Sequence, residues 1–400
     1  GTGDERVVLA RGAHVASLRA RPALPTRRPH RSMLPHHTAL PMPAPPPMLS
    51  TSSATRATGL AAAALAAALL AHPTGALAQQ VDASLYDDYR YRHVGPEGNR
   101  AIAVVGEPGN PLVILVGAAS GGVWKTEDGG ASWRPTFDDQ DAQSIGALAM
   151  APTAPNEVWA GTGETFIIRP ALAMGNGIYK SLDQGDTWQH MGLEATARIG
   201  RIVVHPRNED VVYACALGHA YDDQQERGIY RTTDGGETWE HVLFVDPGTG
   251  CADLAIDPKR PDILFAGMWS LRVDPWQLMS GGTGGGVYVS RDGGDTWNKV
   301  AGRGLPAADA MVGKVSVDIA HSDPDRVYAL LELDNPTFYR SDDGGRSWRM
   351  GNRDNDMAER ASYYTRFRVD TEDPDRIYFA SVRFNMSQDG GRSLVPDPPR

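Results

Sequence analysis

Three carboxylates in long polar segments are the first candidates for chemistry in this sequence. Glu164, Asp222 and Asp274 each have glycine, arginine or aromatic residues nearby. Two carboxylates that flank a glycosidic bond can hydrolyse it, one as the acid and the other as the nucleophile or base. Each of the three is equally an ordinary solvated loop charge, because the sequence does not give the separations on which hydrolysis depends.

Residues suited to binding sugars or anions occur in the same kind of segment. Arginine contacts anions, and aromatic rings stack on sugar rings. The candidates for ligand binding are Arg169, His219, Arg227, Trp269, Arg272, Trp276, Tyr363 and Tyr364. We expect long surface loops to carry them, because binding residues concentrate on loops held by a rigid scaffold.

An eight-residue phrase that recurs six times defines the elements between these segments. Its form is Ser/Thr-x-Asp-x-Gly-x-Ser/Thr-Trp, with leucine replacing tryptophan in the last copy. The aspartate can accept hydrogen bonds from turn amides and the glycine tolerates positive φ, so each phrase predicts a tight turn between two strands. We expect a structural role for its aspartates, which are Asp128, Asp183, Asp234, Asp292, Asp343 and Asp389.

Each repeat divides into four short strands. An apolar strand leads into a turn that often contains proline, a second strand follows, and two more flank the repeated phrase. Evenly spaced short strands without a helical period predict an all-β fold, a β-propeller of four-stranded blades with about six blades present. In such a blade the repeated turn and the proline turn share one rim, so the long loops lie on the opposite rim.

The repeated phrase resembles the Asp-box, or BNR repeat, of sialidases, xyloglucan-specific glycoside hydrolases, sortilin-type receptors and photosystem assembly factors. Segments 91–96, 121–126 and 161–164 look most like secreted bacterial proteins described as sortilin-like or BNR-repeat glycosyl hydrolase-like. The resemblance covers residues 89–394. It implies a propeller that binds a peptide or glycan, with glycoside hydrolysis as the alternative and a role as an assembly factor or scaffold as a weaker one.

The resemblance also bears on the enzyme alternative. In the xyloglucan-hydrolysing relatives an aspartate lies two residues ahead of a Gly-Gly-x-aromatic phrase, which corresponds to residues 121–124 here. Ala119 occupies that position. The second acid of those relatives belongs to another propeller, so the resemblance implies that neither of their two acids is present in this chain.

The first 78 residues differ in kind from the rest. Residues 1–47 are rich in proline and arginine and are predicted to be a disordered leader or a misassigned start. Residues 48–78 contain Arg56, an apolar Ala/Leu run and a small-x-small site, as in a secretory signal peptide. A membrane anchor is the alternative, although the run is short for a span. Residues 79–400 would then form a secreted or periplasmic propeller with no membrane span.

The charge of the chain limits the classes of partner, and its two cysteines bear on the compartment in which it folds. Residues 79–400 carry 47 acidic and 31 basic side chains, which argues against nucleic-acid binding. The two cysteines, Cys215 and Cys251, lie one repeat apart, where they can form a disulfide in an oxidising compartment or remain buried thiols. No metal is expected, because the aspartate-rich turns lack the closing glutamate of a calcium-binding loop and the cysteine spacing suits no zinc site. No cofactor is expected, because the glycine run at 281–286 leads into a strand and not into a helix that could receive phosphate.

The sequence leaves the closure of the ring open. The chain ends shortly after the sixth phrase. Residues 84–94 could supply a closing strand for six blades. Alternatively the chain is a fragment of a larger protein, truncated at its C-terminus and lacking a further propeller, since an open sheet edge leaves backbone groups unpaired.

Overall fold

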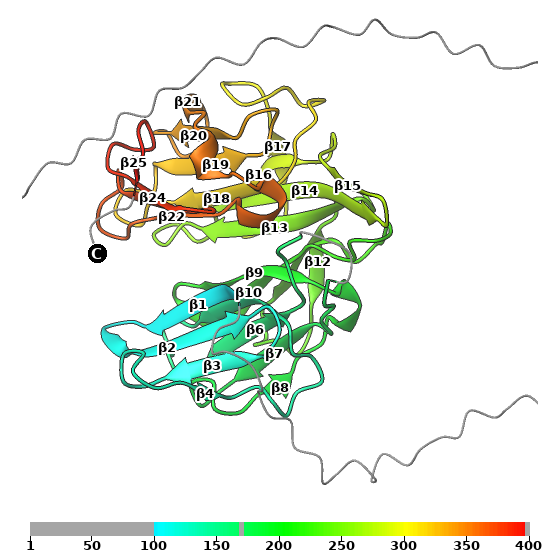
Figure 1. The fold of residues 1–400 in the computed structure, drawn as a ribbon, viewed down its shortest axis with the longest axis vertical. Coiled ribbons are helices and arrows are strands. Elements are labelled where there is room, and N and C mark those ends of the chain that lie inside the picture. The colour runs from blue at the N-terminus through cyan, green and yellow to red at the C-terminus, as the bar shows by residue number, and fades with distance from the viewer. Residues whose placement is uncertain (1–99, 168–171, 397–400) are drawn as a thin grey trace, which may run out of the picture. The chain divides into compact units, whose positions relative to one another are not determined.

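The structure is a computed structural model that describes residues 100–167 and 172–396. Strands connected by turns and loops dominate this part of the chain and form six antiparallel sheets in succession (Figure 1). Within the four-strand path of each sheet the strands pair in sequence order, so each repeat folds on itself before the next begins. The predicted leader, signal peptide and closing strand at 84–94 lie outside the described residues.

The first three sheets contain four strands each. The first consists of β1 (Ala101–Glu107), β2 (Asn110–Ala118), β3 (Val123–Thr126) and β4 (Arg134–Pro135). The second consists of β5 (Ile145–Met150), β6 (Val158–Thr162), β7 (Ile178–Ser181) and β8 (Gln189–His190). The third consists of β9 (Ile199–His205), β10 (Asn208–Ala216), β11 (Gly228–Thr232) and β12 (Glu240–Leu243).

The last three sheets repeat this plan with one addition. The fourth consists of β13 (Thr249–Ile256), β14 (Leu264–Asp274), β16 (Gly286–Ser290) and β17 (Asn298–Val300), with β15 (Gln277–Ser280) paired to the end of β14. The fifth consists of β18 (Val315–Ile319), β19 (Val327–Leu331), β20 (Thr337–Ser341) and β21 (Arg349–Asn352). The sixth consists of β22 (Phe367–Val369), β23 (Ile377–Ala380), β24 (Phe384–Ser387) and β25 (Val395–Pro396).

Short helices interrupt the linkers between sheets. They are η2 (Glu194–Thr196), η3 (Asn355–Met357) and α2 (Ala361–Tyr364). Among residues 100–167 and 172–396, no helix combines the length and the apolar character needed to cross a membrane.

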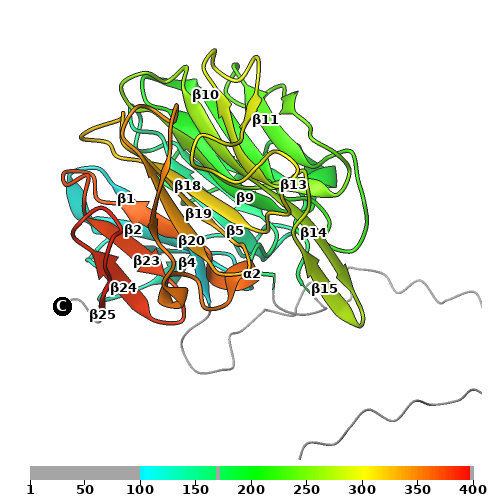
Figure 2. The same ribbon diagram turned by 90° about the horizontal axis from the view of Figure 1, so that it is seen from above.

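The innermost strands arrange the sheets about a common centre. Each first strand packs beside the first strand of the next sheet, in the order β1, β5, β9, β13, β18 and β22. The predicted all-β propeller with six four-stranded blades is therefore confirmed. The fourth sheet differs from the prediction, because β14 continues beyond its partners and forms a hairpin with β15 that projects from the body (Figure 2).

The same bonds hold each repeated turn. In the first copy the Asp128 carboxylate accepts hydrogen bonds from the Thr126 hydroxyl at 2.7 Å and from the amide and hydroxyl of Ser132 at 2.9 and 2.6 Å. The aspartates of the other five copies accept the equivalent bonds. The fourth residue of each phrase also donates its amide to a carbonyl in the first connection of its own sheet or near the start of the second strand, as Gly235 does to the Asp210 carbonyl of β10 at 3.0 Å. The two turns therefore lie side by side on one rim, which we call the turn rim.

These bonds predict a pH-dependent stability. The hydrogen bonds from Ser132, followed by that from Thr126, lower the pKa of Asp128 to about 2. An unfolded aspartate has a pKa of about 4, so the unfolded chain binds more protons between roughly pH 4 and 2. This contribution is fully present above the unfolded pKa and is lost as the pH falls through the folded one. As the pH is lowered from about 5 to about 2.5, we expect the urea midpoint of the wild type to fall. The midpoint of an Asp128→Asn variant should fall less. Equal pH dependence of the two proteins would contradict this assignment.

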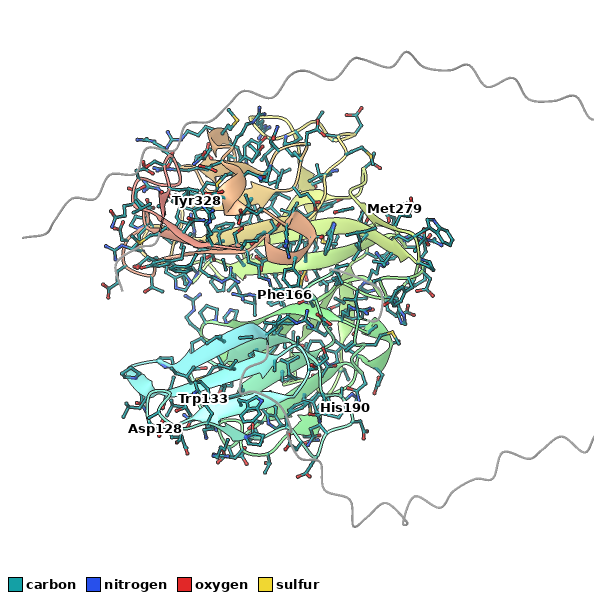
Figure 3. The ribbon with its side chains drawn as sticks, in the orientation of Figure 1. Asp128, Trp133, Phe166, His190, Met279 and Tyr328 are labelled. Atoms are coloured by element: carbon teal, nitrogen blue, oxygen red, sulfur yellow. A yellow bond between two sulfur atoms is a disulfide. The ribbon has the colours of Figure 1, made fainter. Side chains whose placement is uncertain are left out.

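The phrase tryptophans pack against the preceding sheet. Trp188 lies 5.3 Å from the Phe137 ring, and Trp239 lies 6.2 Å from the Trp159 ring, both edge to face. Trp133 of the first phrase is 40 % exposed. Figure 3 shows Asp128 and Trp133 together on the first sheet. The tryptophans of the later copies thus act as the apolar plugs that the sequence predicts between sheets.

A disulfide joins the third and fourth sheets. Cys215 of β10 and Cys251 of β13 are bonded, and both side chains are fully buried. The bond closes a loop with a sequence separation of 36 residues. We expect the double variant Cys215→Ala/Cys251→Ala to lose about 3 kcal/mol of unfolding free energy, mainly because the unfolded chain is no longer constrained. Denaturation of the oxidised protein, the reduced protein and the variant checks this, and a reduced protein as stable as the oxidised one would contradict it.

Candidate functional site

The long loops gather on the rim opposite the repeated turns. At that end of a sheet, the backbone amide of the residue after the second strand donates to the carbonyl of the residue before the first strand. Leu217 donates in this way to the Arg198 carbonyl at 2.9 Å. The second connections of the second, third and fourth sheets share one apolar cluster. Its members are Ile167, Leu172, Leu217, Ala220, Ala252, Trp269, Leu271 and Val273, with Tyr221 packed against them. We call this structure the loop platform.

Arg198 ties two of the platform loops to the linker that precedes β9. Its side chain is fully buried. The guanidinium donates to the carbonyls of Glu164 at 3.0 Å, Leu172 at 3.3 Å and Gly218 at 3.3 Å. It also lies 6.0 Å from the centre of the Tyr221 ring. Burial lowers the pKa of Arg198, but the guanidinium stays charged.

Arg227, a predicted ligand contact, has the same structural role. It is fully buried, and its guanidinium donates to the carbonyls of His219, Asp222, Gly248 and Leu271. All of these acceptors are backbone groups of the platform and the adjoining linker. Arg227 therefore holds the loop that carries His219 and Asp222 against the next sheet.

Two predicted aromatic contacts are also buried. Trp269 is fully buried, and its indole N–H donates to the Ser280 hydroxyl at 2.8 Å. The Tyr363 hydroxyl accepts a hydrogen bond from Arg100 at 3.3 Å, and the Tyr363 ring meets the Phe166 ring edge to face at 5.0 Å. Arg169 lies outside the described residues, and Tyr364 ends α2.

The projecting hairpin carries the most exposed of the predicted contacts. Trp276 lies in its turn and is 79 % exposed. Arg272 beside it is half-exposed, and Asp274 accepts from its Nε at 3.3 Å and from the Gln277 amide at 3.3 Å. Met279 on the returning strand is also exposed, and Figure 3 labels it there. The hairpin thus presents an aromatic ring flanked by polar side chains.

The three candidate carboxylates have different surroundings. Glu164 is buried and forms an ion pair with Arg100 at 2.5 Å. Asp222 is largely exposed and lies 3.8 Å from Nδ1 of His219. The segments carrying Asp222 and Asp274 meet, because the Val273 amide donates to the Ala220 carbonyl at 2.6 Å. The fold therefore brings these two segments together on the platform. Asp274 is paired with Arg272, as Glu164 is with Arg100.

A charged cluster that the sequence did not predict occupies the centre of the ring. Asp253 of β13 is buried and lies 3.8 Å from Arg201 of β9 and 3.6 Å from Arg368 of β22, and it accepts a hydrogen bond from Ser316 of β18. Burial opposes its ionised form, but Arg368 and Arg201 together lower the pKa of Asp253. We call Arg201, Asp253, Ser316 and Arg368 the central cluster, which joins the innermost strands of four sheets.

Comparisons with known proteins agree with this architecture. The family model described as "Sortilin, neurotensin receptor 3" matches residues 110–266, and the model of the BNR/Asp-box repeat matches residues 288–299, across the fourth repeated phrase. The chain is an Asp-box β-propeller. An ancestral GH74 enzyme of known structure superimposes with a TM-score of 0.52 at 19 % identity, over 72 % of this propeller and 39 % of that chain.

The curated relatives of this Asp-box propeller are glycan-active enzymes. A xyloglucanase from Paenibacillus sp is 26 % identical over 268 residues, which cover 60 % of this chain and 25 % of that protein. A xyloglucanase from Acetivibrio thermocellus is 27 % identical over 213 residues, covering 48 % and 24 % respectively. The propeller thus spans about a quarter of the length of these relatives.

The position that the resemblance assigns to one catalytic acid has no carboxylate in this Asp-box propeller. Ala119 follows β2, is fully buried and donates its amide to the Arg100 carbonyl at 2.9 Å. Arg100 also pairs with Glu164, so a buried acid lies on the neighbouring loop instead.

Arg198, Lys314 and the central cluster are charged groups that the sequence did not predict. Burial and the nearby Arg366 lower the pKa of Lys314 to about 7, and its ammonium lies 5.3 Å from the centre of the Trp269 ring. The available signal was a polar residue inside or beside each first strand, such as Arg201, Asp253 and Lys314, where an apolar core residue would be expected. In a propeller those strands line the centre, so charges there can meet across the ring.

Proposed function

We propose that this propeller acts in glycoside hydrolysis, by binding a β-glucan of xyloglucan type on its loop-bearing rim. The names of its curated relatives support the ligand class. The observation that carries the proposal is Trp276, because an indole with 79 % exposure beside polar side chains suits a sugar ring, which has apolar faces and a polar edge. The loop platform holds the base of this hairpin rigidly through Arg227 and Val273.

Glu164, Asp222 and Asp274 are our candidates for catalysis. The segments of Asp222 and Asp274 are in contact, which favours these two over Glu164. A screen for reducing sugar released from xyloglucan tests hydrolysis directly. If the chain releases sugar, Asp222→Asn and Asp274→Asn should each lower the rate at least about 100-fold, whereas Glu164→Gln should have a smaller effect. Binding without release would assign this chain to glycan binding alone.

Peptide binding is the second candidate function. The match of residues 110–266 to the sortilin family model supports it. Arg272 and the carboxylates of the rim offer charged contacts for a peptide. Separate titrations with peptide and with xyloglucan distinguish the two functions, because a propeller that binds only peptide would show no glycan binding.

We propose that the protein is exported. The disulfide between Cys215 and Cys251 supports an oxidising compartment, where such bonds persist. Cleavage after the segment 48–78 remains a prediction, to be tested by sequencing the N-terminus of the protein recovered from the producing cell.

Replacing Trp276 by alanine should weaken binding of xyloglucan oligosaccharide by at least about tenfold, because the only stacking surface of the hairpin turn is removed. The exposed Trp133 provides a matched control, since it lies on the turn rim and is also accessible. Isothermal titration of both variants measures the effect. Equal losses in Trp133→Ala and Trp276→Ala, or none in either, would refute the assigned rim.

A further inference from the structure

Basic side chains of one sheet reach the repeated phrase of the next. Between the first and second sheets, Lys125 Nζ lies 2.8 Å and Arg134 Nη2 lies 2.5 Å from one carboxylate oxygen of Asp186. Between the third and fourth sheets, Arg231 lies 2.6 Å from Asp295. Asp186 and Asp295 are the sixth residues of their phrases, and they neutralise the preceding sheet's cations together with Glu127 and Glu240 respectively.

The junction between the fifth and sixth sheets has the same cations and no such acid. Arg340 and Arg349 are paired across β20 and β21, as Lys125 and Arg134 are across β3 and β4. The sixth residue of the following phrase is Arg392. An arginine therefore occupies the place in which Asp186 provides a carboxylate in the first junction.

A cavity of about 370 Å³ lies at this junction. It is lined by Arg340, Arg349, Met350, Gly351, Gly390 and Arg392. Gly390 has a φ of 73°, and a Cβ there would collide with the guanidinium of Arg340. The glycine thus leaves room for the arginine that forms the wall of the cavity.

The acids around the cavity do not balance its arginines. Asp342 lies 2.7 Å from Arg340 and 2.9 Å from Arg349, and Asp375 lies 2.8 Å from Arg340. Both carboxylates also bind Arg326. The exposed Arg392 side chain has no carboxylate within ion-pair distance among residues 100–167 and 172–396. Arg326, Arg340 and Arg349 thus share two carboxylates, and Asp323 lies 3.9 Å from Arg326. Arg392 adds a fourth cation at the wall of the cavity.

We propose that this cavity binds a small acidic molecule through its carboxylate, sulfate or phosphate group, which takes the place that the Asp186 carboxylate has in the first junction. Guanidinium groups bind such oxyanions through paired N–H donors. The cavity is much larger than the roughly 30 Å³ that one water molecule occupies in the liquid. Its volume lies within the ~300–1,000 Å³ range of small-molecule pockets, so the ligand is larger than a bare ion. A sugar acid has this size and chemistry.

Isothermal titration with glucuronate, inorganic sulfate and neutral glucose tests the proposal. We expect one saturable site for glucuronate, weaker binding of sulfate at the same site, and no binding of glucose. Arg392→Asp restores the arrangement of the first junction, so it should bind glucuronate at least about tenfold more weakly and be no less stable than the wild type. Arg392→Ala should also lose affinity, and because Arg392 is exposed this variant should fold.

The first junction offers the reciprocal variant. Asp186→Ala leaves Glu127 as the remaining carboxylate beside Lys125 and Arg134, at 3.3 and 3.6 Å. This variant should add a second anion site and raise the stoichiometry from one to two. The proposal is wrong if the wild type binds none of the anions, if glucose binds as well as glucuronate, or if Arg392→Asp binds glucuronate as tightly as the wild type. If sulfate binds as tightly as glucuronate, the site recognises the negative charge of an oxyanion and not the sugar ring.

Discussion

Replacing Asp253 by alanine should lower the free energy of unfolding by about 3 kcal/mol. Removing one partner of a buried ion pair costs about 3–5 kcal/mol, because the remaining charge is left uncompensated. Asp253 is buried and faces two arginines, Arg201 and Arg368. Both arginines are half-buried and retain some contact with water, so we expect the lower end of this range.

Urea denaturation near neutral pH measures the loss in Asp253→Ala. Asp253→Asn keeps an acceptor for the Ser316 hydroxyl and should lose less, since only the charge is removed. The exposed Glu372 provides a matched control, and Glu372→Ala should change stability by less than about 0.5 kcal/mol. A loss below about 1 kcal/mol in Asp253→Ala would show that the arginines are satisfied without it.

Replacing Arg198 by methionine should lower stability by about 3 kcal/mol and loosen the loop platform. The guanidinium satisfies three carbonyls in the segments that carry Glu164, Leu172 and Gly218. An unsatisfied buried acceptor costs about 1–3 kcal/mol, and the recovered cost of burying the charge offsets part of that sum. Because the platform holds the hairpin of Trp276, glycan affinity should fall as well.

Two comparisons distinguish an effect of Arg198 on the platform from a direct contact between Arg198 and the glycan. Trp276→Ala should lower glycan affinity without changing the urea midpoint, whereas Arg198→Met should lower both. Arg198→Lys keeps the charge but places all its donors on one nitrogen, whereas the guanidinium uses three, so its effect should be intermediate. An Arg198→Met protein with the stability of the wild type would mean that water replaces the guanidinium at the carbonyls.

The two variants act on different parts of the propeller. Asp253 joins the innermost strands at the centre, where Arg366 also reaches the Gly200 carbonyl at 3.2 Å and the Ile102 carbonyl at 3.4 Å. Arg198 acts at the rim, between loops. Both substitutions should lower the stability of the ring against cooperative unfolding, and Arg198→Met should in addition make the loops open locally.

The sequence by itself determined the fold and the turn rim. The repeated phrase specifies its turn through local contacts, since Asp128 bonds to residues within four positions of itself. Such contacts depend on the phrase and not on distant residues. The division into six sheets follows for the same reason, because pairing in each sheet joins neighbouring segments of one repeat.

Only the tertiary structure decided which loop residues are available to a ligand. Arg227 and Trp276 were equivalent candidates in the sequence, yet Arg227 is fully buried among backbone carbonyls and Trp276 is exposed on a hairpin. The difference arises from packing between sheets, which depends on residues far away in the chain. The same applies to Asp253, whose partners Arg201 and Arg368 come from other blades and become neighbours only when the ring assembles around its centre.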